Sequence, residues 1–139
     1  MAEQDSPSAL WSLLLAVWLL VIVAITTLPW GNFDGQAHWD RVQWIPFSHF
    51  SWRSPRRWLE TIANVVLFIP LGFLVVRVHR AHGLWAGVIA CGAGLAVSMS
   101  AELFQVFTVR RFPTMTDLCT NTFGSLCGAV AADRWGGSA

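Results

Sequence analysis

The chain has 139 residues, of which 55% are hydrophobic and 12% are charged, against about 25% charged residues in ordinary soluble domains. The net charge is +1, which gives no broad basic surface, so we expect no nucleic-acid partner. The three cysteines lie inside apolar segments, without a CxxC pair or a histidine at ligand spacing. We therefore expect no metal site and no cofactor.

The first predicted element is an uncharged apolar run over residues 9–28. As a helix, its 20 residues reach about 30 Å, which matches the hydrocarbon thickness of a bilayer. The alternative is a signal peptide, but residues 1–8 carry Glu3 and Asp5 and no basic residue. The run is also longer than the apolar core of a signal peptide. We predict a transmembrane helix.

Residues 29–59 form a polar loop that contains Trp30, Trp39, Trp44 and Trp52. An indole placed at a membrane surface buries its rings and keeps its N–H in water, so this composition is typical of an interfacial aromatic belt. The other interpretation is a loop that folds back over the bundle. The two interpretations are compatible.

Three further helices are predicted at about 60–78, 83–108 and 116–133. Pro70 interrupts the first of them, which lipid tolerates only where neighbouring groups satisfy the freed backbone. Gly124 and Gly128 form a GxxxG pattern in the last, a spacing that favours close helix packing. Short turns join these helices, which indicates an up-down bundle. We predict an all-α, polytopic membrane protein, a bundle of about four transmembrane helices, with residues 1–139 forming one domain.

Polar side chains gather at one end of this predicted bundle. Ser98, Glu102 and Gln105 share one helix face, as do Asp117 and Asn121, and Asn64 follows the start of the second helix. A charge near hydrocarbon costs about 2.5–3.5 kcal/mol and usually faces the interior. The candidate ligand-binding residues are Asn64, Glu102, Gln105, Arg111, Asp117 and Asn121.

A structural role is the alternative for each of these residues. Glu102 and Asp117 would pair with Arg111 or a loop arginine and lock the helices together, although a buried ion pair is weak evidence for stability. Asp117 also lies where a helix-capping residue is expected, and Thr116 is the other capping candidate. Gln105, Asn121 and Asn64 would make ordinary hydrogen bonds between helices.

Two blocks of sequence resemble the VanZ-like family of small bacterial membrane proteins. One is NVVLFIPLGFL at 64–74, preceded by IPF at 45–47, and the other covers residues 101–128. The second block resembles a family pattern of E-x-x-Q, an arginine and then D-x-x-x-N-x-x-G-x-x-x-G. Relatives often carry further aspartates before the final one, where this chain has Thr114 and Thr116, which puts a cation or basic substrate held by those acids in doubt.

The family takes its name from a protein associated with teicoplanin resistance. The resemblance implies a multi-pass protein of the bacterial inner (cytoplasmic) membrane that binds an amphiphilic cell-envelope ligand and contributes to antibiotic resistance. That ligand would be a lipoglycopeptide or a lipid-linked precursor at the outer interface. One alternative is a membrane-embedded enzyme with Glu102 and Asp117 as acid–base or metal-holding carboxylates. Another is an ion-coupled transporter or accessory subunit, which would require an oligomer.

The arginines bear on which side of the membrane the polar end faces. Six lie at the predicted polar end and three at the other, so the positive-inside rule favours the cytoplasm for the polar end. They are Arg41, Arg53, Arg56, Arg57, Arg110 and Arg111 against Arg77, Arg80 and Arg134. The family resemblance favours the outer face, and an arginine paired with a carboxylate counts little. We expect the polar end to face outward.

Overall fold

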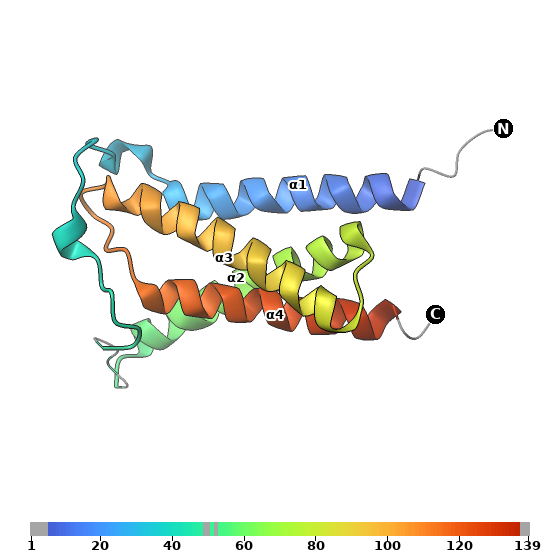
Figure 1. Ribbon diagram of the computed structural model, residues 1–139. Helices are drawn as coiled ribbons and strands as arrows, with labels where there is room; N and C mark the ends of the chain where they lie inside the picture. The colour runs from blue at the N-terminus through green and yellow to red at the C-terminus, as the bar shows by residue number, and fades with distance from the viewer. Residues whose placement is uncertain (1–5, 49–50, 52, 137–139) are drawn as a thin grey trace.

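A computed structural model describes residues 6–48, 51 and 53–136. It contains four α-helices, α1 (Ser6–Thr27), α2 (Pro55–His79), α3 (Gly83–Val106) and α4 (Met115–Gly136). Two short 3-10 helices, η1 (Trp30–Asn32) and η2 (Trp39–Arg41), lie in the long loop after α1. Figure 1 shows the helices side by side, with that loop at one end and both termini toward the other. The predicted all-α bundle of about four helices is confirmed.

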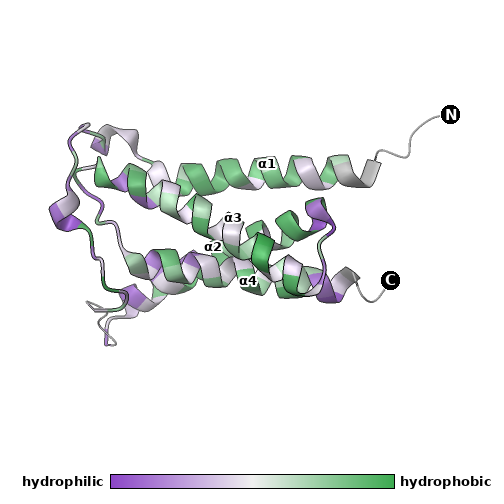
Figure 2. Ribbon diagram, in the orientation of Figure 1, coloured by the Kyte–Doolittle hydropathy of each residue, from purple (hydrophilic) through white to green (hydrophobic). Residues whose placement is uncertain are grey.

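Three of the four helices are long and apolar enough to cross a membrane: α1 from Ala9 onward, α2 and α3. Helix α4 has 22 residues, which is a sufficient length, but threonine, asparagine, serine and glycine make it less apolar. Figure 2 shows this difference, with α1 mostly green and α4 mixed. Helix α4 tolerates these small polar residues because α2 and α3 pack along it.

Helix α2 begins at Pro55, five residues before the expected start at 60, for a local reason. The hydroxyl of Ser54 accepts a hydrogen bond from the backbone N–H of Arg57, and proline suits the first helical position. The helix continues through Pro70 to His79. Nε1 of Trp18 on α1 donates to the carbonyl of Leu67 at 3.0 Å, next to the carbonyl of Val66 that Pro70 leaves without its helical donor.

Glycines hold α2 and α4 together as the closest helix pair. A Cβ atom at Gly128 would collide with the carbonyl oxygen of Ile69, and one at Gly124 with that of Val65. In the other direction, a Cβ at Gly72 would collide with the backbone of Ser125. Without side chains at these points, the two backbones come into direct contact. The packing role predicted for the GxxxG pattern is confirmed.

Helix α1 packs on the bundle along one stripe. Ile22 is fully buried and lies in a cluster with Phe68, Leu71 and Val75 of α2. Many other apolar side chains of α1 are exposed, with Leu13 and Leu20 among those that point outward. A helix that is apolar on its outer face in a bundle of this length is suited to contact with lipid.

The loop between α1 and α2 folds back over the end of the bundle. Its backbone pairs with the α3–α4 turn, since Val109 donates to the carbonyl of Asn32 (2.9 Å) and Gln43 donates to that of Pro113 (2.9 Å). Trp30 and Trp44 nevertheless stay 65% and 60% exposed. The interpretation as a loop that folds back over the bundle is therefore confirmed, and the interfacial belt stays a prediction. Trp52 lies outside the described residues.

Candidate functional site

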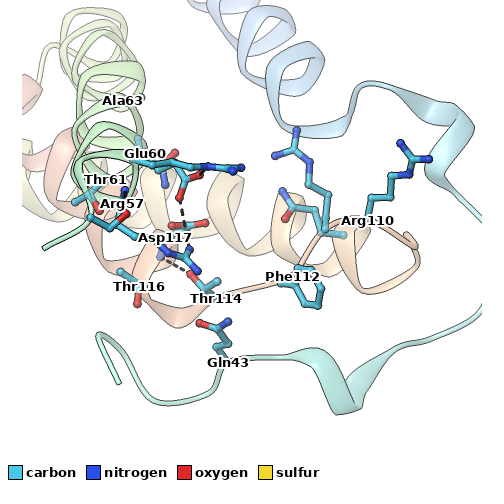
Figure 3. A pocket seen from close by; sticks show the side chains of 15 residues that line it. Gln43, Arg57, Glu60, Thr61, Ala63, Arg110, Phe112, Thr114, Thr116 and Asp117 are labelled. Atoms are coloured by element: carbon cyan, nitrogen blue, oxygen red, sulfur yellow. Dashed lines mark hydrogen bonds and ion pairs between the residues drawn. The ribbon is translucent and has the colours of Figure 1, made fainter. Parts of the chain in front are cut away.

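A polar cavity of about 610 Å³ opens at the loop end of the bundle. It lies between the first turns of α2, the end of α3 and the turn that leads into α4 (Figure 3). Its lining combines four arginines and two acids with hydroxyl and amide side chains, and only Ala63 and Phe112 are apolar. Such a site offers hydrogen-bond donors and acceptors, together with charges of both signs, at the edge of an apolar bundle.

The structure places four of the six predicted site residues on the cavity wall. They are Asn64, Gln105, Arg111 and Asp117. Glu102 is 7% exposed and lies directly behind the wall, in contact with the backbone of Thr114. Asn121 lies one helical turn beyond Asp117 and forms no part of the lining. The predicted convergence at one end is therefore present, with the six residues at different depths.

Thr114 connects the two carboxylates. Oε2 of Glu102 accepts a hydrogen bond from the backbone N–H of Thr114 at 2.7 Å, and the hydroxyl of Thr114 accepts one from the N–H of Asp117 at 3.0 Å. In an ordinary capping box, an acid three residues into the helix would accept the N–H of the capping residue. Here Glu102 accepts the N–H of Thr114. The carboxylate of Asp117 instead accepts hydrogen bonds from the hydroxyl of Thr114 and the side-chain amide of Asn64.

The arginines at the cavity differ in their partners. Arg56 and Arg57 both pair with Glu60, at 2.9 Å and 3.5 Å. Arg111 instead donates one Nη2–H to the carbonyl of Leu28 at the end of α1, 3.3 Å away. Within the described residues, no carboxylate lies at ion-pairing distance from Arg110 or Arg111. Arg111 therefore forms no direct ion pair with Glu102 or Asp117, and its charge acts on Glu102 from a longer distance.

The two deeper amides connect helices. Nε2 of Gln105 donates to the carbonyl of Thr26 on α1 at 3.3 Å, so this side chain both lines the cavity and ties α1 to α3. Nδ2 of Asn121 donates to the hydroxyl of Ser98 at 2.9 Å, and both side chains are buried. Asn121 therefore has the interhelical role that was its alternative interpretation.

Most lining residues were not among the predicted ones, and two of them show why: Thr114 as a connector and Gln43 as a lining residue. The Thr114-x-x-Asp117 spacing is a capping pattern, so the sequence carried a signal for the first. The predicted caps were Thr116 or Asp117, and the structure shows that Thr114 makes the bond. Gln43 had no such signal, because it reaches the cavity only through the backbone pairing of the loop with Thr114.

The comparison with known families covers almost the entire chain. A family model described as VanZ/LLP1 matches residues 11–135. The chain belongs to the VanZ/LLP1 family. No curated protein and no solved structure matches it significantly.

The two threonines that depart from the VanZ-like pattern have structural partners in this chain. Thr114 connects Glu102 to Asp117, as described above. The hydroxyl of Thr116 accepts a hydrogen bond from the backbone N–H of Phe47 at 2.9 Å, which fastens the tryptophan-rich loop to the start of α4. In this member of the VanZ/LLP1 family, the two threonines therefore hold the turn before α4 against α3 and against the tryptophan-rich loop.

Proposed function

We propose that this VanZ-family protein binds the polar part of an amphiphilic cell-envelope ligand at the outer face of the bacterial inner membrane and thereby contributes to antibiotic resistance. The ligand would be a lipoglycopeptide or a lipid-linked precursor. The observation that carries the proposal is the position of the 610 Å³ polar cavity, at one end of a bundle whose outer surface is apolar. An amphiphile in the membrane would meet apolar helices and a polar site together.

The aromatic side chains around the cavity support this assignment. Phe112 lines the cavity and is 56% exposed, and Trp44 and Ile45 project from the loop that covers the same end. Trp39 stacks on Trp44 with ring centroids 6.5 Å apart. Exposed aromatic groups beside a polar site give an acyl chain or a sugar ring a surface to pack on. The cavity would then hold the polar groups through its charges and amides.

A susceptibility assay with teicoplanin tests the proposal. We expect a strain that expresses the wild-type protein to grow at a several-fold higher teicoplanin concentration than the same strain with an empty vector. Asp117→Asn removes a charge from the cavity wall, so it should abolish most of that difference. Asp133→Asn, at the other end of the bundle near Gly83, is the matched control and should retain it. Equal susceptibility with and without the wild-type gene, at confirmed expression, would contradict the proposal.

A further inference from the structure

The cavity has an excess of positive charge that the protein does not neutralise. Glu60 pairs with Arg56 and Arg57, whereas no carboxylate of the described residues lies within ion-pairing distance of Arg110 or Arg111. Glu102 acts on Arg111 only from a longer distance. Arg111 gives one N–H to a backbone carbonyl and keeps its other donors. Figure 3 shows Arg110 across the cavity from Arg57 and Glu60. Adjacent guanidinium groups that face open space without an acid are a site for an anion.

Two helix N-termini border the cavity. Ser54, the N-cap of α2, lines the cavity, and so does Thr114, which directly precedes α4. The positive end of the α2 dipole adds to the potential in this space, whereas at α4 the carboxylate of Asp117 in the first turn offsets the dipole. A carboxylate presents two oxygens, whereas a phosphoryl group presents at least three acceptor positions and more negative charge. Two guanidinium forks, the start of α2 and the hydroxyls on the wall fit the phosphoryl group better.

The geometry of α2 indicates that this anion arrives on a lipid. Leu67, Phe68 and Leu71 of α2 pack against α1. One turn earlier, the same stripe of α2 carries Ala63 and Asn64, and these line the cavity. The cavity therefore begins where α1 no longer covers α2, and Figure 3 shows the end of α1 and the start of α2 on opposite sides of it.

The rim of the cavity at Ala63 continues into the lipid-facing surface. Ala63 is exposed although it lines the cavity, and its neighbours Ile62 and Val66 are 54% and 57% exposed. A hydrocarbon chain attached to the bound head group can leave along these apolar side chains without crossing a polar barrier. A free phosphate ion would have no need of such an apolar exit.

We propose that the cavity binds the phosphoryl group of a membrane lipid or lipid-linked precursor, with Arg110 and Arg111 on the anion and the hydrocarbon chain leaving between α1 and α2 past Ala63. This inference rests on the proposed function and narrows its ligand class to phosphoryl amphiphiles. Inorganic phosphate shares the chemistry of the head group, and the lipid chain distinguishes the two sources.

Native mass spectrometry of the full chain in mild detergent provides the first test. Dioleoyl phosphatidate and dioleoylglycerol carry the same acyl chains and differ in the phosphoryl group, so we expect the protein to retain the former at least tenfold more tightly. Arg110→Gln should lower the phosphatidate affinity by about tenfold, the range of one charge-assisted hydrogen bond. Arg53→Gln removes an exposed charge outside the cavity and should leave the affinity unchanged. A thermal melt of each variant confirms that it is folded.

A second pair of variants tests the route of the chain. Ala63→Phe should fill the exit and weaken phosphatidate binding, whereas Val88→Phe, at an exposed position of α3 outside the cavity lining, should not. Inorganic phosphate should bind weakly and be indifferent to both changes. Tight binding of inorganic phosphate that survives Ala63→Phe, with no gain from the acyl chains, would overturn the lipid source.

The outcomes separate this inference from the proposed function. Equal retention of phosphatidate and dioleoylglycerol would overturn the phosphoryl assignment and leave an amphiphile site in place. An equal loss in Arg110→Gln and Arg53→Gln would assign the effect to general surface charge and would also overturn it. Failure of every amphiphile, teicoplanin included, to bind the folded protein would overturn the proposed function as well.

Discussion

Glu102 has a buried side chain that holds the turn before α4 by accepting the backbone N–H of Thr114. Replacement by alanine would leave the backbone N–H of Thr114 without the acceptor that now lies 2.7 Å away. An unsatisfied buried donor costs about 1–3 kcal/mol. We expect Glu102→Ala to lower the apparent free energy of unfolding in detergent by at least that amount, as measured by a denaturant titration followed by tryptophan fluorescence.

Glu102→Gln is the matched control, because its amide oxygen can accept the same N–H. It keeps an oxygen acceptor for the backbone N–H of Thr114, so we expect a loss of less than about 1 kcal/mol. Destabilisation by glutamine as large as that by alanine would mean that the charge of Glu102, rather than its contact with Thr114, supports the turn. Folded Glu102→Gln protein then allows the charge to be tested in the susceptibility assay without loss of the site.

Helical periodicity was sufficient to predict that Asn64, Gln105 and Asp117 lie at one end of the bundle. Gln105 and Asn64 follow from spacing alone, since each lies on one face near the end of an apolar segment. The partner of Glu102 could not be predicted in this way, because Thr114 reaches it through the conformation of a turn. Arg111 was placed correctly but its partner was not, since the competing acceptor is a backbone carbonyl, of Leu28. Backbone acceptors have no signature in the side-chain pattern.

At the scale of helices, the α2–α4 pair depends on the absence of side chains at its glycines. A methyl group at Gly128 would meet the carbonyl oxygen of Ile69 and the backbone nitrogen of Phe73, neither of which can move aside. Overpacking of this kind costs about 1–3 kcal/mol or more. We expect Gly128→Ala to lower the thermal unfolding midpoint in detergent. It should also displace the walls of the cavity, because Asn64 and Asp117 belong to these two helices.

Gly92 of α3 provides the control for the change from glycine to alanine itself. A Cβ atom there would have no neighbour within 4 Å. Alanine favours the helix by about 1 kcal/mol at an unhindered position, so Gly92→Ala should keep or raise the midpoint. A decrease in both variants would show that the helices, and not the α2–α4 contact, respond to the substitution.

The helices themselves were largely predictable from hydrophobicity, and the start of α3 at Gly83 was predicted correctly, whereas the start of α2 was not. Helix α2 begins at Pro55 because Ser54 caps it. Four polar residues in its first turns interrupt the apolar run, so hydrophobicity alone predicts a later start. The three-dimensional course of the loop over residues 29–54 was out of reach, since it depends on backbone pairs such as that between Gln43 and Pro113. Those pairs join segments that are far apart in the sequence.

The orientation of the whole molecule in the membrane determines which side the cavity faces. The count of arginines favours the cytoplasm, but most of those at the cavity end are engaged within the protein. Arg41 donates to the carbonyl of Val109, Arg56 and Arg57 pair with Glu60, and Arg111 donates to Leu28. The positive-inside rule counts basic residues irrespective of nearby Asp and Glu. These partners therefore do not cancel the majority, and the outward orientation rests on the family resemblance.

A reporter fused after Ala139 decides the orientation, since α4 runs away from the cavity and ends at the opposite side of the bundle (Figure 1). With the cavity outward, a green fluorescent protein fused there should fluoresce and an alkaline phosphatase should be inactive, because only the first matures in the cytoplasm. Fusion of the same reporters after His79, where α2 ends on that side, should give the same pair of results. Active phosphatase at both positions would place the cavity in the cytoplasm, where an externally added glycopeptide cannot reach it and only a ligand of the inner leaflet could.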